Sequence, residues 1–208
     1  MITTVDIVDL QCGNAKSIEN WLSRNNCRAN RVNEPNDIRS DVLILPGVGA
    51  AGVYLDKLKN AGLDSAIKTH VKTGGRILGI CLGFQILMEF TQEDGGVEGI
   101  GLFKGYVERL PGNESHNAWE KLLFEKKLLS GSEKWGVNKF TRRKKLIGRV
   151  FYNHEFAVVN ESLKQKSLPI SNGMSKYSSL IVDGSVFGCQ FHPEKSQVTG
   201  DRLLKMIL

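Results

Sequence analysis

A glycine-flanked cysteine is the residue of this chain best suited to nucleophilic chemistry. In Gly79-Ile80-Cys81-Leu82-Gly83, glycines stand two positions before and two positions after the cysteine. A strand that turns sharply into a helix requires such small residues, because larger side chains would clash in the turn. The pattern predicts a nucleophile elbow, with Cys81 at the amino terminus of a helix over residues 84–90. The helix dipole and free N–H groups there favour the reactive thiolate, and the Leu82 N–H can stabilise a developing oxyanion. A buried structural cysteine in a glycine-rich turn is the alternative.

A histidine with a carboxylate close by supplies a matching base. His192 and Glu194 lie two residues apart, and Pro193 between them biases the preceding residue toward extended backbone. In an extended segment these two side chains point the same way. His192 is predicted to accept the thiol proton and return it to a leaving amine, while Glu194 orients the imidazole. The remaining histidines have no such partner nearby in the sequence: His70, His116 and His154.

A third segment, Leu45-Pro46-Gly47-Val48-Gly49-Ala50, is a glycine-rich turn after a buried strand. Glycine lets the backbone reverse an amide and approach a ligand closely, so an N–H of Gly47 or Val48 could complete an oxyanion hole. A phosphate-binding loop is a weaker alternative, because no Gly-Lys-Ser/Thr sequence follows. A plain strand-to-helix connection is the structural alternative.

The hydrophobic pattern around these segments predicts an α/β fold. Short runs rich in Val, Ile and Leu indicate buried strands, and amphipathic stretches between them indicate helices. Such alternation favours a sheet wound by right-handed crossovers, here a central mixed, mostly parallel sheet flanked by helices. Asp183-Gly184 suits a hairpin turn. Strands are expected at residues 5–10, 41–45, 76–80, 101–110, 149–159, 178–182 and 185–191, and helices at 17–23, 63–71 and 198–208.

Length and composition indicate an ordinary globular domain. The chain has 208 residues, 41% hydrophobic and 24% charged, and no Ser, Gly or Pro-rich linker divides it, so we expect a single domain over residues 1–208. Its four cysteines form no C-x-x-C pair, which argues against a zinc site or a disulfide framework. The amino terminus lacks signal-peptide features, and the most apolar stretch is too short to span a membrane. A cytoplasmic protein with no metal is expected.

The net charge of +6 is concentrated in one basic segment, residues 121–149. The segment holds ten Lys or Arg against two acids, a local charge of +8. A nucleic-acid surface or a docking face for an acidic partner would be basic in this way. A solvated face is favoured, because no aromatic residues interleave within the cluster at 142–145 as stacking on bases requires. We assign no nucleic-acid site to it.

Taken together, these segments resemble the class I (triad-type) glutamine amidotransferases. The resemblance rests on the turn at residues 45–50, the elbow at 79–85 and the segment 190–196, with Gly13-Asn14 and Ser17-Ile18 as a weaker fourth point. It extends over essentially the whole chain and implies a flavodoxin-like fold with the elbow at the carboxyl end of a central strand. The implied activity is hydrolysis of L-glutamine to glutamate and ammonia through a γ-glutamyl thioester on Cys81, without a cofactor.

The same resemblance implies roles for further residues. Gln85 and Glu93 would bind the glutamine substrate, and Gly49 would lie beside it. The N–H groups of Val48 and Leu82 would form the oxyanion hole. In this family the Gly-Val peptide must flip to complete that hole. Activity is therefore expected to stay low until a synthase partner docks.

The implied partner is a (β/α)8-barrel synthase subunit that receives the ammonia in a heterodimer, and Lys195 occupies a partner-facing position. Two segments depart from the family pattern. Residues 115–120 stand where members usually carry Pro-His-x-Gly-Trp-Asn, and residues 154–157 where they carry His-Ser-Tyr-Tyr. Because both flank the glutamine site and the partner interface, the ammonia acceptor stays open between histidine biosynthesis and amidation of a surface-polysaccharide sugar.

Two other classes of function share these residues. A partner-independent γ-glutamyl hydrolase on the same framework would also use a cysteine, a histidine and an acid, and would cleave peptide-like γ-glutamyl substrates unaided. A binding subunit without catalysis would require the combination of Cys81, His192 and Glu194 to be coincidental.

Overall fold

A seven-stranded sheet forms the centre of the computed structural model, which describes residues 2–125, 144–165 and 167–208. Its strands are β1 (Thr3–Val8), β2 (Cys27–Val32), β3 (Val42–Leu45), β4 (Arg76–Ile80), β11 (Ser167–Pro169), β12 (Ser178–Asp183) and β13 (Val186–Cys189). Their order is β11-β12-β13-β4-β3-β1-β2. The strands from β13 to β2 run parallel, whereas β12 pairs antiparallel with β13 at one edge and β11 pairs antiparallel with β12. The predicted mixed, mostly parallel sheet is confirmed.

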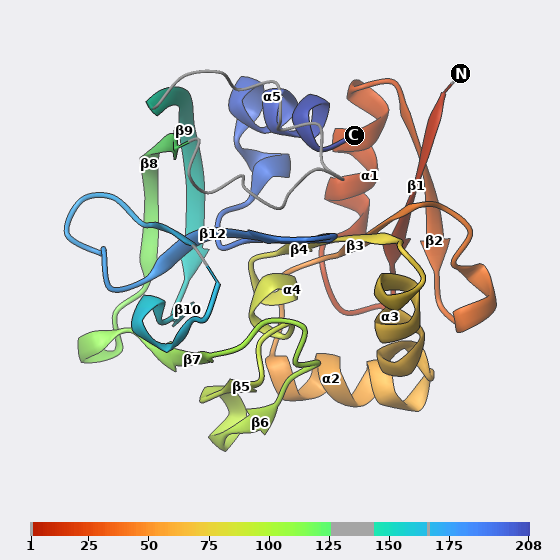
Figure 1. The fold of residues 1–208 in the computed structure, drawn as a ribbon, viewed down its shortest axis with the longest axis horizontal. Helices are drawn as coiled ribbons and strands as arrows, with labels where there is room; N and C mark the ends of the chain where they lie inside the picture. The colour runs from red at the N-terminus through yellow and green to blue at the C-terminus, as the bar shows by residue number, and fades with distance from the viewer. Residues whose placement is uncertain (1, 126–143, 166) are drawn as a thin grey trace.

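Helices cover both faces of this sheet (Figure 1). Helices α1 (Ala15–Arg24) and α5 (Gln197–Ile207) lie on one face, and α2 (Ala51–Asn60) and α3 (Leu63–Lys72) lie on the other. Successive side chains of β3 point to opposite faces of the sheet. Val42 and Ile44 belong to the core shared with α1 and α5, whereas Leu43 and Leu45 belong to the core shared with α2 and α3. A strand covered on both faces must be apolar throughout, as this one is.

Smaller sheets pack beside one end of the central sheet. Strands β8 (His116–Glu125) and β9 (Lys144–His154) form an antiparallel pair. A four-stranded sheet has the order β10-β7-β5-β6, comprising β10 (Phe156–Val158), β7 (Tyr106–Arg109), β5 (Phe90–Thr91) and β6 (Val97–Glu98). The strand expected at 149–159 is thus divided between β9 and β10, where the chain leaves one sheet for the other.

One expectation about the elbow was wrong. A helix over residues 84–90 was predicted, but helix α4 (Leu82–Gln85) is a single turn and Phe90 lies in β5. The segment at residues 100–103 explains the early end. Its N–H groups donate to the carbonyls of residues 86–88, with Ile100 N 2.7 Å from Ile86 O and Phe103 N 2.9 Å from Leu87 O. These carbonyls are therefore unavailable for further helical bonds.

Among the described residues, no helix has the length and apolar character needed to cross a membrane. The same part of the chain contains no group of three or more His, Cys, Asp or Glu residues arranged to hold a metal ion. Residues 126–143 of the basic segment, including Arg142 and Arg143, lie outside the described residues.

Candidate active site

Cys81 occupies a tight turn between β4 and α4. Its backbone has φ 49° and ψ −107°, an uncommon conformation for a residue with a side chain. Contacts across the turn exclude side chains at the flanking positions. A Cβ on Gly83 would lie 2.1 Å from the Leu45 carbonyl oxygen, and a Cβ on Gly79 would lie 2.7 Å from Leu87 Cδ1. The chain therefore forms a nucleophile elbow at the carboxyl end of a central strand.

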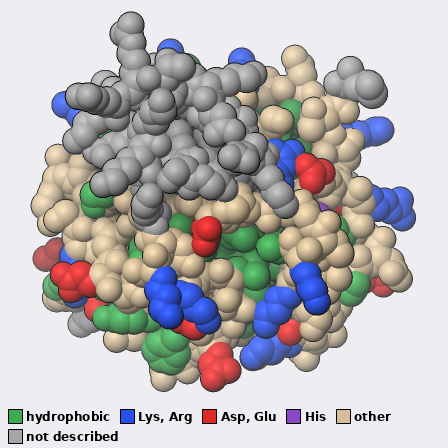
Figure 2. Space-filling view, viewed as in Figure 1, with side chains coloured by type: hydrophobic (Ala, Val, Ile, Leu, Met, Phe, Trp, Pro, Cys, Tyr) green, Lys and Arg blue, Asp and Glu red, His purple; other side chains and the backbone are tan. Residues whose placement is uncertain are grey.

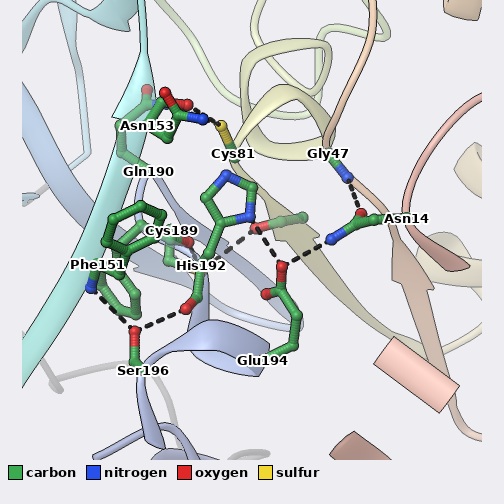
Figure 3. Close-up of polar contacts among 12 residues, drawn as sticks. Asn14, Gly47, Cys81, Phe151, Asn153, Cys189, Gln190, His192, Glu194 and Ser196 are labelled. Atoms are coloured by element: carbon green, nitrogen blue, oxygen red, sulfur yellow. Dashed lines mark hydrogen bonds and ion pairs between the residues drawn. The ribbon is translucent and has the colours of Figure 1, made fainter. Parts of the chain in front are cut away.

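His192 and Glu194 lie next to this elbow, on the segment that follows β13. His192 Nδ1 donates to Glu194 Oε1 at 2.9 Å, and both side chains are buried. Figure 3 shows the imidazole between Cys81 and Glu194, with its other nitrogen toward the sulfur. Cys81 is thus brought together with two residues that follow it by more than 100 positions in the sequence. This is the arrangement of a nucleophile, a proton carrier and an orienting carboxylate.

The electrostatics of the cluster favour an ion pair. Burial opposes a charge on His192, but its interactions with Cys81 and Glu194 outweigh burial and raise the pKa of His192 to about 10. His192 is consequently an imidazolium at neutral pH. A cation held against Cys81 stabilises the thiolate, which is the nucleophilic form. Gln190 Nε2 also donates to Cys81 Sγ at 3.6 Å. His192 is therefore placed to exchange a proton with Cys81.

Backbone contacts hold His192 in place. Its N–H donates to the Phe151 carbonyl at 2.8 Å, which attaches the segment to β9. Ser196 Oγ donates to the His192 carbonyl at 2.6 Å and accepts from the Phe151 N–H at 3.0 Å (Figure 3). Both the N–H and the carbonyl of His192 are thus hydrogen-bonded, which holds the imidazole in position.

Asn14 is a site residue whose role the sequence did not reveal. Its Nδ2 donates to Glu194 Oε1 at 2.6 Å, and its Oδ1 accepts from the Gly47 N–H at 3.3 Å (Figure 3). Asn14 therefore joins the orienting carboxylate to the glycine-rich turn. It follows β1, which is the neighbour of β3 in the sheet, so its position beside the turn at the end of β3 is a consequence of strand order. A prediction that β1 and β3 are neighbours would have placed Asn14 beside the glycine-rich turn.

A cavity of about 430 Å³ opens above Cys81. The predicted oxyanion residues Val48 and Leu82 both line it, as does Gly49. The N–H of Gly47 is engaged by Asn14, so Val48 is the residue of this turn whose N–H suits an oxyanion. A Cβ on Gly47 would lie 1.6 Å from the Ile80 carbonyl oxygen, which explains why the turn can approach the elbow so closely. The full lining comprises Gly47, Val48, Gly49, Cys81, Leu82, Gln85, Glu93, Ser115, Asn153, His154, Glu155 and Phe156.

The two residues predicted to bind substrate, Gln85 and Glu93, face the same cavity. Gln85 Nε2 donates to the Phe156 carbonyl at 2.6 Å and to Gln190 Oε1 at 3.2 Å. Burial raises the pKa of Glu93 to about 7, and the charge of Asp94 adds to this shift. A cationic ligand would stabilise the ionised form of Glu93, because it offsets the free-energy cost of burying the negative charge.

His154, which lines the cavity, belongs to a second group of buried polar residues that the sequence did not reveal. His116 and His154 have no carboxylate partner nearby in the sequence, but they are register partners across β8 and β9, and His116 Nδ1 lies 3.1 Å from His154 Nε2. Glu120 Oε1 lies 3.7 Å from His116 Nε2. All three side chains are buried. Burial lowers the pKa of His154 to about 3, so this histidine is neutral.

Lys195 lies outside the cavity lining, on the surface. Its Nζ is 5.9 Å from the centre of the Phe151 ring, which in turn lies 5.6 Å from the half-exposed Trp119 ring. Val48 is also exposed to a similar extent, 36%. Figure 2 shows hydrophobic side chains gathered around a hollow near the centre of one face, with Lys and Arg side chains below it. Exposed apolar groups beside a basic side chain are typical of a protein interface.

The elbow, the buried His-Glu pair and the α/β sheet define a class of enzyme that attacks a carbonyl carbon with cysteine. Residues 6–207 match the family described as glutamine amidotransferase class-I, and the chain belongs to this family. It is therefore an enzyme of the glutamine amidotransferase type.

Individual relatives within this family are similar to the chain over nearly its full length. "Imidazole glycerol phosphate synthase subunit HisH" of Prochlorococcus marinus (strain MIT 9211) is 35% identical, over 98% of this chain and 93% of its own. The protein of the same name from Caldanaerobacter subterraneus subsp. tengcongensis is 34% identical, over 97% and 95%. A solved structure titled "Structure of PurLQS from Thermotoga maritima" has a TM-score of 0.73 at 20% identity, covering 100% of this chain and 98% of that chain. This structural similarity shows that the two chains share a fold.

Proposed function

We propose that this chain is the glutaminase subunit of an imidazole glycerol phosphate synthase in histidine biosynthesis. It hydrolyses L-glutamine to L-glutamate and passes the ammonia to a (β/α)8-barrel subunit. The observation that carries the proposal is the buried His192–Glu194 pair beside Cys81 on its elbow, in a chain whose relatives bear the name of that synthase subunit.

The first half of the reaction acylates Cys81. Its thiolate attacks the side-chain carbonyl carbon of glutamine, forming a C–S bond and an oxyanion. As the oxyanion collapses, the C–N bond breaks and His192 Nε2–H gives its proton to the departing nitrogen, which leaves as ammonia. Glu194 keeps Nδ1–H as its hydrogen-bond partner at 2.9 Å, so the imidazole presents Nε2 to the substrate throughout.

The second half releases glutamate. Neutral His192 now removes a proton from a water molecule as that water attacks the γ-glutamyl thioester. The C–S bond then breaks, glutamate leaves, and the thiolate and imidazolium are restored. The N–H groups of Val48 and Leu82 stabilise the oxyanion in both halves, since both residues line the cavity beside Cys81.

Glutamine is held by other residues that line the cavity. Glu93 pairs with the α-ammonium group of the substrate, which suits a carboxylate whose pKa burial has raised to about 7. Gln85 turns its Nε2 toward protein acceptors, so its Oε1 is oriented to accept from the substrate. Gly49 permits close approach at φ 122°.

The barrel subunit contacts the exposed side chains of Lys195, Trp119 and Val48. Lys195 is exposed beside the Phe151 ring, and the apolar surfaces of Trp119 and Val48 suit a desolvated contact. Because Val48 belongs to the oxyanion turn, docking can act directly on the peptide that must flip. Glutamine hydrolysis is therefore coupled to assembly.

The test is glutamine hydrolysis by the wild-type chain and by Cys81→Ala, each alone and with the barrel subunit of the same organism, with and without that subunit's nucleotide substrate. We expect hydrolysis that rises when the loaded barrel is added and disappears in Cys81→Ala. Strong hydrolysis by the isolated wild-type chain would instead indicate a partner-independent γ-glutamyl hydrolase. No hydrolysis in a demonstrated complex would indicate a binding subunit.

Complementation tests the pathway separately. The gene should restore growth without histidine to a strain that lacks its own glutaminase subunit, when supplied together with its cognate barrel, and the Cys81→Ala version should not. Failure of an active wild-type pair to restore growth would assign the ammonia to a different acceptor.

A further inference from the structure

Asp94 directly follows the glutamate assigned to the substrate ammonium and lies beside the start of α2. We infer that Asp94 is a positioning residue for glutamine binding, which acts on Glu93 through a hydrogen bond to α2 and through its own charge. This role rests on the proposed function, because it takes Glu93 as a ligand of glutamine. Figure 1 shows α2 beside β5 and β6, the strands that flank the turn at Glu93–Gly95.

A hydrogen bond joins this turn to the helix. Asp94 Oδ2 accepts from the Gly52 N–H at 2.8 Å. The first N–H groups of a helix have no carbonyl partner within it, and Ala50, at the capping position of α2, has no side-chain oxygen to offer. A carboxylate from the turn takes that place, where the positive end of the helix dipole also favours it. A Cβ on Gly52 would lie 3.0 Å from the same oxygen, so glycine leaves room for the contact.

The helix is the fixed partner in this contact. Tyr54 and Leu58 of α2 are buried in the core beneath the central sheet. The turn, in contrast, consists of half-buried and exposed residues, and Asp94 itself has φ 54° and ψ 33°, in the left-handed region. Aspartate and asparagine tolerate this region better than most residues. Loss of the hydrogen bond is therefore expected to free the segment that carries Glu93, while α2 stays in place.

The charge of Asp94 has a second effect on its neighbour. Burial raises the pKa of Glu93 to about 7, and the charges of Asp94 and Glu155 add to the shift, whereas the Ala51 N–H and Arg109 oppose it. Arg109 Nη2 lies 2.7 Å from Glu155 Oε2, so these two charges offset each other. Asp94 is therefore the carboxylate whose removal should lower the pKa of Glu93.

Two variants separate the hydrogen bond from the charge. Asp94→Asn keeps an oxygen for the Gly52 N–H and the tolerance for positive φ, but removes the charge. Asp94→Gly tolerates the same φ and removes both. In the assembled complex at pH 8, where Glu93 is ionised, we expect Asp94→Gly to raise KM for glutamine about threefold or more with kcat nearly unchanged, and Asp94→Asn to match wild type. Asp56→Asn, an exposed change of the same charge on α2, is the control.

The pH dependence supplies a readout that a loosened turn alone would not produce in Asp94→Asn. Carboxyl-carbon NMR of the isolated chain follows the titration of Glu93 without requiring activity. We expect its pKa to fall by about 0.5 in Asp94→Asn and to stay unchanged in Asp56→Asn. The ratio of KM at pH 6 to KM at pH 8 should then fall from about tenfold in wild type to about fourfold in Asp94→Asn.

The outcomes that would overturn this role are distinct from failure of the proposed function. An unchanged KM at pH 8 in a folded Asp94→Gly, or an equal rise in Asp94→Asn, would show that the hydrogen bond does not position Glu93. An unchanged pKa of Glu93 in Asp94→Asn would overturn the role of the charge, even if Asp94→Gly failed to fold. A wild-type complex without glutaminase activity would instead overturn the proposed function.

Discussion

The cavity has two walls that are built in different ways. The wall formed by the elbow and the glycine-rich turn consists of backbone packed on backbone, where a single added carbon at Gly47 or Gly83 would lie 1.6 or 2.1 Å from a carbonyl oxygen. The facing wall at the ends of β8 and β9 is lined by polar side chains, among them the buried His154, which has hydrogen-bond partners in His116 and the Phe156 carbonyl. Backbone packing tolerates almost no substitution, whereas a polar network can be rebuilt from different side chains. The two walls are therefore expected to differ in how much substitution they tolerate.

The largest effect is expected from Gly83→Ala. Its methyl group would meet the Leu45 carbonyl, which is backbone and cannot rotate away, so the elbow must distort. We expect a loss of about 3 kcal/mol or more in unfolding free energy, together with loss of glutamine hydrolysis. Gly173→Ala is the matched control, because its added carbon meets nothing within 4 Å and only its φ of 87° opposes the change. Denaturant unfolding of both variants measures the difference. Equal losses of unfolding free energy would contradict the claim that backbone packing makes the elbow wall intolerant of substitution.

The next effect is expected from Glu194→Gln, which keeps the size of the side chain and removes its charge. The interaction with Glu194 helps to raise the pKa of His192 to about 10, so the pKa should fall in this variant. We expect kcat to drop by roughly 10³-fold, because a neutral partner no longer supports the imidazolium. Steady-state kinetics in the complex and NMR titration of His192 measure the two quantities. A normal kcat would show that Glu194 does not serve the reaction.

A smaller effect is expected from Asn14→Ala. The change removes the link between Glu194 Oε1 and the Gly47 N–H, and each lost hydrogen bond to a charged or backbone group costs about 1–2 kcal/mol. We expect kcat to fall about tenfold while KM changes little, since Asn14 does not line the cavity. Asn20→Ala, an exposed change on α1, is the control. A rise in KM for glutamine without a change in kcat would instead show that Asn14 acts in glutamine binding.

The mildest prediction concerns pH. Glu93 must be ionised to pair with the substrate ammonium, and its raised pKa of about 7 means that it becomes ionised as pH rises through that value. KM for glutamine should therefore fall about tenfold between pH 6 and pH 8. Glu93→Gln should have a higher KM that no longer varies over this range. A wild-type KM independent of pH would contradict the assigned role of Glu93.

The elbow side of the site was largely predictable because most of its constraints are local. A Cβ on Gly79 would meet Leu87 and Gly83, within a few residues of Cys81, although Gly83 itself meets the distant Leu45 carbonyl. His192 is extended as expected, but Pro193–Lys195 forms a 3-10 turn, so the expectation of an extended segment through Glu194 was wrong. The apolar runs that became β1, β3 and β4 also follow from burial on both faces. Where the prediction also failed, in the helix at 84–90, the cause is a distant segment at 100–103 that takes the carbonyls.

The opposite wall was not predictable, because its contacts depend on strand register. His116 meets His154 only because β8 and β9 pair antiparallel, with a register shift between Leu122 and Leu123. Nothing near either histidine in the sequence determines that alignment. Asn14 is a similar case, since its contact with Gly47 depends on β1 and β3 being neighbours in the sheet.

The central claim is that Cys81 is the nucleophile that carries the γ-glutamyl group. The most direct test is covalent labelling with 6-diazo-5-oxo-L-norleucine, a glutamine analogue that alkylates an attacking thiolate, followed by peptide mass spectrometry of the assembled complex. We predict a single modification on the peptide that contains Cys81, prevented by excess glutamine and absent from Cys81→Ser. Modification of Cys12 or Cys189 instead, or none in a complex that hydrolyses glutamine, would contradict the account.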